Sequence, residues 1–200
     1  MYSEELKTTI KEHLKGTLSP HRYQHVLGVA QAARQLAEKY GGDADQAEVA
    51  GLLHDAAKQM DLPAMQKLAW RSFGSTLPDT IVSIGSLLHG YAAVTIAREQ
   101  YGIDDADLLA SLAHHTTGAE HMSLLEKIIF MADYIEVNRD FDGVDKLRRL
   151  AVEDLDKAVL AGYDSTIFHL LEQGKTIYVG TVTNRNAHIL SMKKDRTHHG

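Results

Sequence analysis

Six side chains of metal-ligand type are spread along this sequence, each within an apolar segment. In chain order they are His25, His54, Asp55, His89, His115 and Asp133. Imidazole and carboxylate ligands together suit iron, manganese or zinc. Two such metal ions, about 3.5–4 Å apart, can hydrolyse phosphate esters by activating water and polarising a phosphoryl oxygen. The pattern therefore favours metal-dependent phosphate hydrolysis.

The carboxylates are the most informative members of this set. Asp55 follows His54 directly in "AGLLHDAAK", and Asp133 lies in the strongly apolar "IIFMADYI". Burying a carboxylate is costly unless it is paired or binds a cation. His25 and His89, taken one at a time, would also fit histidines satisfied within a core. A buried salt-bridge network could explain one or two of the six residues, but few Lys or Arg occur in these segments. A shared metal site accounts for the whole set.

The remaining histidines fit the pattern less well. His114 and His115 are adjacent, and neighbours on a helix point about 100° apart, so only one should face the site. Helical spacing favours His115, although other helical phases remain compatible and assistance from His114 is left open. The others lack an acidic or histidine companion at useful spacing, and we expect surface or local structural roles for them. They are His13, His21, His121, His169, His188, His198 and His199.

Four residues near these ligands are candidates for contacting a phosphorylated substrate: Lys58, Arg22, Arg139 and Thr116. Lys58 and Arg22 lie four residues after and three residues before a candidate histidine, so on a helix they would share its face. Arg139 could reach the site around a helix end, and Thr116 opens a tight Thr-Thr-Gly turn. A solvated helix end, a surface salt bridge or a simple helix stop would explain each of them equally well.

The elements that must position these residues are helical nearly throughout. Ser3, Asp43 or Asp45, and Ser123 are predicted N-terminal caps, and Gly41 and Gly102 are predicted helix stops. The segment 73–86 is expected to be a connector with one helical turn, and residues 144–183 should form two or three closing helices. Apolar spacing predicts the other helices over residues 3–15, 19–42, 43–55, 63–70, 91–101, 104–115 and 123–141.

Composition narrows the class of protein. With 200 residues and 44% hydrophobic content, the chain is expected to form a single all-α domain over residues 1–200. Its metal-site core would span about 20–143, its closing helices about 144–190 and a polar tail 191–200. The absence of cysteine excludes disulfides, thiolate metal sites and a cysteine nucleophile. A net charge of -6 argues against general nucleic-acid binding. No signal peptide or apolar run of roughly 20 residues is found, so we expect a cytoplasmic protein without a membrane partner.

The ordered motifs resemble a known group of enzymes. His25, His54-Asp55 and Asp133 are arranged as in the metal-dependent HD-domain phosphohydrolase superfamily. The longer segments "RYQHVLGVAQAARQLAEKYG", "LLHGYAA", "HHTTG" and "LEKIIFMADYIEVNRDFDGV" are similar to its YqeK-type branch, the symmetrical diadenosine tetraphosphate hydrolases of bacteria. The resemblance covers roughly residues 20–143.

This resemblance implies an all-helical HD fold that holds two metal ions, most often iron, with manganese or another transition metal as alternatives. It assigns metal ligation to the six residues named above and selects His115 over His114, because His115 directly precedes Thr-Thr-Gly. It further implies symmetrical hydrolysis of a dinucleoside tetraphosphate to two ADP-like products.

The sequence leaves open several residue roles, the exact reaction and the oligomeric state. We hypothesise that Asp55 bridges the two metals, and that Lys58 and the nearby arginines neutralise charge on the phosphates. Another HD phosphohydrolase activity, as a nucleotidase or a cyclic-nucleotide phosphodiesterase, is the first alternative. A nucleotide-binding regulatory module is the second. The sequence also leaves open whether the protein forms a homodimer.

Overall fold

The structure is a computed structural model that describes residues 2–198, and the side chains of residues 2–194. Within this part of the chain there are eleven helices and no strand, so the predicted all-α class is confirmed. The helices are α1 (Glu4–Thr17), α2 (Pro20–Tyr40), α3 (Ala44–Leu53), α4 (Leu62–Phe73), α5 (Asp79–Val82), α6 (Gly85–Tyr101), α7 (Ala106–His114), α8 (Leu124–Ile135), α9 (Val144–Glu153), α10 (Leu155–Glu172) and α11 (Val179–His198).

Five helix ends lie at capping residues that the sequence indicates. The side chains of Ser3, Asp43 and Ser123 each accept a backbone N–H from the first turn of the following helix. Ser123 also forms a reciprocal capping box, because the Glu126 carboxylate accepts the Ser123 N–H at 2.7 Å. Gly41 and Gly102 end α2 and α6 in the left-handed conformation, with φ of 76° and 64°. Local chemistry therefore determines where these helices begin and end.

Four predicted boundaries are wrong, including the end of α4, which lies at Phe73 and not at residue 70. Helix α6 begins at Gly85, six residues before the predicted start at Tyr91, because Leu88 packs into a core that the local sequence does not reveal. Helix α3 ends at Leu53, so His54 and Asp55 lie in the turn that follows. Helix α8 ends at Ile135 and not near residue 141. The polar tail beginning at residue 191 continues α11 as a helix through residue 198, whereas residues 199–200 lie outside the described residues.

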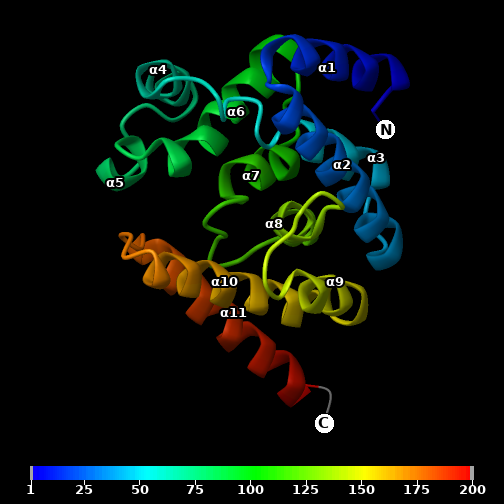
Figure 1. Cartoon of the computed structure of the whole chain (residues 1–200), viewed down its shortest axis with the longest axis vertical. Helices are drawn as coiled ribbons and strands as arrows, with labels where there is room; N and C mark the ends of the chain where they lie inside the picture. The colour runs from blue at the N-terminus through cyan, green and yellow to red at the C-terminus, as the bar shows by residue number, and fades with distance from the viewer. Residues whose placement is uncertain (1, 199–200) are drawn as a thin grey trace.

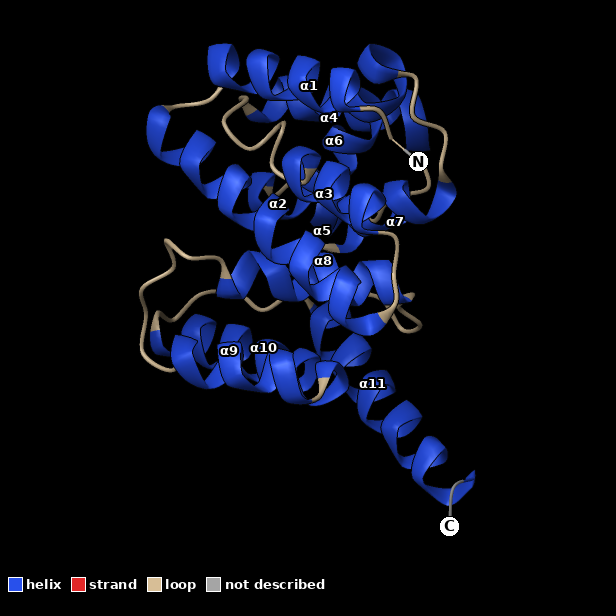
Figure 2. Cartoon of the chain, turned by 90° about the vertical axis from the view of Figure 1, so that its right-hand side faces the viewer, coloured by secondary structure: helices blue, strands red, loops and turns tan. Residues whose placement is uncertain are grey.

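The helices pack around two groups of buried apolar residues. The larger group joins α2, α3, α7, α8 and α10, and includes the fully buried Phe130 and Tyr163. The smaller group joins α4 and α5 to one face of α6 through Met65, Ile81 and Leu88. Helix α1 lies at one end of the molecule and α9 and α10 near the other, with α7 and α8 between them (Figures 1 and 2). Helix α11 packs against α10 and then projects away from the other helices.

None of the described helices combines the length and the apolar character that a membrane span demands.

A close crossing of α2 and α3 brings the first two histidines of the pattern together. Gly51 on α3 lies directly against α2, and a Cβ atom at this position would be 2.7 Å from the Ala30 Cα. Backbone cannot move aside as a flexible side chain can, so a glycine is needed here. His25 on α2 and His54 after α3 are held close to one another by this contact, with ring centroids 5.4 Å apart.

Helix α1 is fastened to α3 by a buried lysine that the sequence did not reveal. The Lys7 side chain is only 1% exposed, and its Nζ lies 2.7 Å from Asp45, 3.1 Å from Glu48 and 2.8 Å from Glu4. Lys7 and Arg34 lower the pKa of the Asp45 carboxyl. Burial raises the pKa of Glu48, but Lys11 and Lys7 outweigh it, so the net shift is downward.

Replacing Lys7 by methionine is expected to lower the free energy of unfolding by about 1–3 kcal/mol, because two partly buried carboxylates lose a cation. Their lowered pKa values stabilise the wild type above about pH 4, and this contribution is lost as pH falls through the folded pKa values. The variant should therefore lose less stability on acidification. Urea denaturation at pH 6 and pH 3 measures both effects, with Lys15→Met, at an exposed lysine in the last turn of the same helix, as the control. Identical pH dependence in wild type and Lys7→Met would contradict this account.

Candidate metal centre

The six predicted ligands converge although they come from five separate segments. His25 lies on α2, His54 and Asp55 follow α3, His89 lies on α6, His115 follows α7 as its C-cap and Asp133 lies on α8. Their nitrogen and oxygen atoms form three overlapping groups in which all ligand atoms lie within 4.8 Å of one another. The groups are His25, His54 and Asp55; His54, His115 and Asp133; and Asp55, His89 and His115.

All four imidazoles are held by their Nδ1 atoms. The Nδ1 of His54 contacts the Gly51 carbonyl at 2.7 Å, and that of His115 contacts the Leu112 carbonyl at 2.8 Å. His89 Nδ1 contacts the carbonyl of Gly85 at 3.3 Å, one helical turn earlier on α6. A carbonyl only accepts, so each Nδ1 must carry the proton and donate it. The Nε2 atoms of these rings are then left as unprotonated lone pairs.

These Nε2 atoms face one another inside the protein. His89 Nε2 and His115 Nε2 lie 2.9 Å apart, and both rings are at most 1% exposed. Two lone pairs at this distance repel unless a cation lies close to both. The Nε2 atoms of His25 and His54 are also buried, and neither has a hydrogen-bond partner. A buried nitrogen without a partner costs free energy. The donor set therefore fits metal ions, which would use all four lone pairs.

Asp55 is the carboxylate that all four imidazoles share. Its Oδ1 lies 3.1 Å from His89 Nε2 and 3.8 Å from His115 Nε2. Its Oδ2 lies 3.6 Å from His54 Nε2 and 3.7 Å from His25 Nε2. Each oxygen thus faces a different pair of rings.

Burial and neighbouring charges set the protonation of the cluster. Burial lowers the pKa of His115 to about 3, with further lowering by His89 and His54. Burial likewise lowers the pKa of His54. Burial raises the pKa of the Asp55 carboxyl, but His54, His89 and Lys58 outweigh it and hold the pKa well below its usual range. Neutral imidazoles and ionised carboxylates are the forms that bind metals.

Asp133 supplies the second carboxylate from α8. Its Oδ1 lies 3.1 Å from His25 Nε2 and 4.0 Å from His54 Nε2. Burial raises the pKa of this carboxyl, but contacts with His25 and Arg139 outweigh it and hold the pKa well below the usual range. The Asp133 side chain is 22% exposed, compared with 5% or less for the other five candidate ligands. The cluster is therefore most open to solvent at Asp133.

The structure places all four candidate substrate contacts beside the cluster. The Arg22 guanidinium lies 2.7 Å from Asp55 Oδ2, and Lys58 Nζ lies 3.3 Å from His89 Nε2. Arg139 donates to the Asp133 carboxylate and, at 2.7 Å, to its backbone carbonyl. Thr116 Oγ1 lies 3.2 Å from His115 Nε2. Lys58 reaches its position from the turn after α3 and not from a continuous helix face, as the spacing argument assumed.

Two of the other histidines have partners elsewhere. His114 turns to Glu126, with 2.5 Å between Nδ1 and Oε1, and packs edge-on against Tyr91. His188 is buried, and its Nε2 lies 2.8 Å from the Asp156 carbonyl. His188 thus has the local structural role expected of it, whereas His114, whose assistance the sequence left open, contacts Glu126 and Tyr91.

Sequence analysis missed one carboxylate that contacts the cluster. Glu136 follows α8, is 2% exposed, and its Oε1 lies 3.1 Å from His25 Nδ1. Its Oε2 accepts the backbone and side-chain N–H groups of Asn138 at 2.8 and 2.9 Å. Gly28 leaves the space for this carboxylate, because a Cβ atom there would be 2.2 Å from Oε2. Its spacing in the sequence could have identified it, because Glu136 lies three residues after Asp133 at the end of an otherwise apolar segment.

The segment after α8 is fixed from α9 as well. Arg148 on α9 donates through its Nε to the Ile135 carbonyl at 3.1 Å. The Nη2 atom of Arg148 donates to the carbonyls of Glu136 and Arg139 at 3.0 and 2.9 Å. One guanidinium therefore binds three carbonyls of the segment that presents both Glu136 and Arg139. The closing helices contribute to the geometry of the cluster although they supply none of its candidate ligands.

Replacing Glu136 by glutamine is expected to weaken metal binding by about 10-fold, because His25 Nδ1 loses the charged acceptor that orients the ring. Gly28→Ala should have a similar effect, because its methyl group would displace the same carboxylate. Titrating each protein with metal, and measuring the fraction of occupied sites at each metal concentration, gives the change in metal affinity. Val137→Ala, at an exposed position of the same segment, is the matched control. Wild-type metal affinity in both Glu136→Gln and Gly28→Ala would contradict the orienting role.

Comparison with known proteins places this cluster in a family. The HD domain family matches residues 22–138, a span that contains all six converging residues. The chain belongs to the HD domain family. The histidine and aspartate cluster of this HD-domain protein is the expected position for its divalent metal ions, and the predicted family membership is confirmed.

Similar proteins match this HD-domain chain over nearly its whole length. One from Halalkalibacterium halodurans, named "Bis(5'-nucleosyl)-tetraphosphatase, symmetrical", is 42% identical over 180 residues, which cover 90% of this chain and 95% of that protein. A Bacillus subtilis protein of the same name is 34% identical, covering 93% and 97%. A crystal structure from Clostridium acetobutylicum, described as a "predicted HD superfamily hydrolase involved in NAD metabolism", superposes with a TM-score of 0.88. It is 41% identical and the match covers 96% of this chain and 99% of that chain.

Proposed function

We propose that this protein hydrolyses diadenosine tetraphosphate symmetrically to two ADP. The observation that carries the proposal is the convergence of four inward-facing Nε2 atoms and two carboxylates on one small volume. Relatives of similar length that carry the name symmetrical bis(5'-nucleosyl)-tetraphosphatase support the choice of substrate. All six proposed ligands come from one chain, so the proposed metal centre takes no ligand from a second copy, and a homodimer stays a prediction from the sequence.

Two metal ions are proposed as cofactors, with iron as the first choice and manganese as the second. His25, His54, Asp55, His89, His115 and Asp133 would hold them. Nitrogen-rich sites with carboxylates suit these metals. When bound, they supply Lewis acidity toward a phosphoryl oxygen and allow water to attack near neutral pH.

The surrounding cations would act on the phosphate chain itself. Arg22 and Arg139 each lie within hydrogen-bond distance of a proposed ligand carboxylate, and Lys58 lies within that distance of His89. Phosphate oxygens drawn to the cluster would therefore come within reach of all three. Arginine and lysine stabilise charge that grows on the attacked phosphorus and on the departing diphosphate. Thr116 would orient an oxygen from the His115 side.

Product analysis tests the reaction directly. Protein purified without chelator would be incubated with diadenosine tetraphosphate, and the products separated by anion-exchange chromatography. Two ADP and no ATP or AMP is the expected result. AMP with ATP would show asymmetrical cleavage, and release of inorganic phosphate from mononucleotides alone would support a nucleotidase; either outcome would overturn the proposal.

We further propose that residues 1–200 work as a single domain. Asn184 on α11 donates to the carbonyls of Thr117 and Gly118, both at 3.0 Å, and so holds the turn that presents Thr116. The last helix thus contributes to the position of the turn beside His115, although it supplies no proposed ligand. The cytoplasmic location stays a prediction from the sequence.

A further inference from the structure

The Thr-Thr-Gly turn after α7 packs against a tyrosine from the closing helices. Gly118, the last residue of this motif, has a left-handed backbone with φ of 63°, and its N–H donates to the His114 carbonyl at 2.7 Å. A Cβ atom at Gly118 would lie 1.7 Å from the Tyr163 hydroxyl oxygen and 2.5 Å from Cζ of the same ring. No side chain larger than hydrogen fits between them, so the Tyr163 hydroxyl lies directly against the turn.

The ring of Tyr163 is fixed by its neighbours. It lies on α10, is fully buried, and packs against Phe130 of α8 with ring centroids 4.8 Å apart. Helix α10 also packs against α11, and the connection between α7 and α8 reaches down to α10 (Figure 1). A side chain held from three helices keeps its place when a short turn beside it is free to shift. The hydroxyl can therefore limit the movement of the turn.

The Tyr163 hydroxyl is buried without a hydrogen-bond partner among the described residues. Burial raises the pKa of this hydroxyl, so it keeps its proton and remains an unused donor. An unpaired buried hydroxyl costs free energy, and phenylalanine would fill nearly the same space without that cost. Packing alone therefore gives no reason for a tyrosine at this position.

The other end of the turn carries two residues of the proposed site. His115 is one of the six proposed ligands, and the Thr116 hydroxyl lies 3.2 Å from its Nε2. Asn184 holds the Thr117 and Gly118 carbonyls from α11. Consecutive Cα atoms are joined at a fixed separation, so a shift of Gly118 toward α10 would also move Thr116.

We propose that Tyr163 is a positioning residue of the enzyme. Its hydroxyl stops the Thr-Thr-Gly turn from relaxing toward α10 and so keeps Thr116 where it meets a phosphate oxygen. This inference rests on the proposed function, which gives Thr116 its phosphate. Tyrosine in place of phenylalanine therefore lowers the stability of the fold while it strengthens the binding of phosphate.

Tyr163→Phe separates these two effects because they have opposite signs. Removing the unpaired hydroxyl should raise Tm by about 2 °C. The relaxed turn should weaken the binding of inorganic phosphate to the metal-loaded protein by about 5-fold, as expected when one hydrogen bond is misplaced. Calorimetric titration with inorganic phosphate measures this affinity, and elemental analysis should find the same metal content as in wild type.

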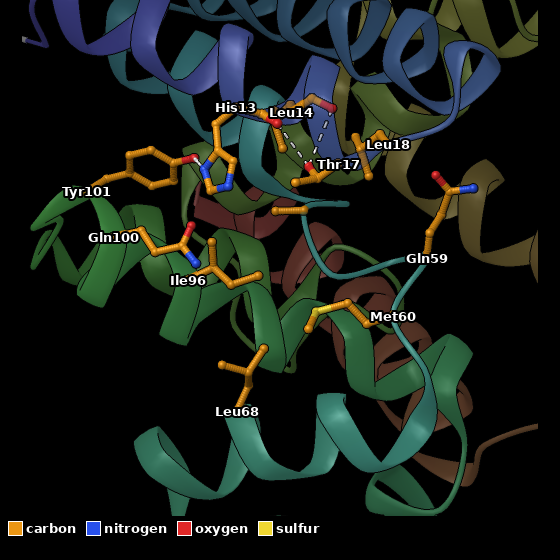
Figure 3. Close-up of a pocket in the computed structure, with 11 residues that line it drawn as sticks. His13, Leu14, Thr17, Leu18, Gln59, Met60, Leu68, Ile96, Gln100 and Tyr101 are labelled. Atoms are coloured by element: carbon orange, nitrogen blue, oxygen red, sulfur yellow. Dashed lines mark hydrogen bonds between the residues drawn. The ribbon is translucent and has the colours of Figure 1, made fainter.

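Tyr101→Phe is the matched control. Tyr101 ends α6, and its hydroxyl contacts His13 Nδ1 at 2.7 Å beside a hollow of about 240 Å³ (Figure 3). None of the six proposed metal ligands lines this hollow. The control loses the same atom, but from a hydroxyl that has a partner. It should therefore gain no stability and should bind phosphate as wild type does.

The outcomes separate the positioning role from the reaction. Equal or higher Tm with weaker phosphate binding in Tyr163→Phe would support the proposal. Wild-type phosphate affinity in this variant would overturn it. A loss of both stability and affinity would also overturn it, because the hydroxyl would then be a structural group with a partner in the fold. The same holds if metal-loaded wild type binds no inorganic phosphate. If wild type binds phosphate but does not form two ADP from diadenosine tetraphosphate, the proposed function fails, and the phosphate titration still decides the role of Tyr163.

Discussion

Replacing Asp55 by alanine is expected to reduce kcat/KM for diadenosine tetraphosphate by at least about 1000-fold, or ~4 kcal/mol of transition-state stabilisation. Each of the two oxygens of this side chain lies within 3.8 Å of two imidazole Nε2 atoms. Its removal would therefore separate the two halves of the proposed metal centre. Initial rates of ADP formation, measured with excess metal, give the change.

The controls for Asp55 must separate lost chemistry from lost folding. Asp104→Ala removes a carboxylate that is 90% exposed and should have a near-wild-type rate. Asp55→Asn keeps the shape of the side chain but removes its charge, and circular dichroism would establish that both Asp55 variants are folded. A folded Asp55→Ala variant with a rate close to that of wild type would contradict the bridging role.

Removing metal from the wild-type protein should abolish more than about 99% of its activity, because neither the attacking water nor the phosphoryl oxygen would then be polarised by a Lewis acid. Adding iron is expected to restore the rate, and manganese to restore part of it. Elemental analysis of the reconstituted enzyme should find two metal ions per chain. Free metal at 100 times its dissociation constant should also stabilise the fold by about 2.7 kcal/mol, visible as a higher Tm.

Two results would contradict this prediction. Full activity after exhaustive chelation would show that the cluster does not depend on metal for catalysis. A single ion per chain at full activity would show that a dinuclear centre is not required. Glu136→Gln, which retains all six proposed ligands, provides an intermediate case in which activity should return only at higher metal concentration.

The segments that are predicted best from the sequence are those whose structure depends on neighbours within one or two helical turns. Ser3, Asp43 and Ser123 cap helices where predicted, because a side-chain oxygen and the N–H groups it accepts lie within three residues of each other. The start of α6 was missed for the opposite reason. Gly85 and Gly90 weaken the local helical signal, and the helix is stabilised by Leu88 packing with residues of α4 and α5.

Donor chemistry could be predicted from sequence because a carboxylate such as Asp133 within an apolar segment needs a partner wherever the chain folds. Tertiary structure alone decided which ring nitrogen faces inward, which carboxylate is shared and where the cluster opens. His25 and Glu136 illustrate the reason, since they contact each other across 111 residues of chain. Nor does any local pattern place Tyr163 against Gly118, because only the packing of α10 against α8 brings them together. The sequence determines which side chains are available. The distances between helices determine what those side chains can do together.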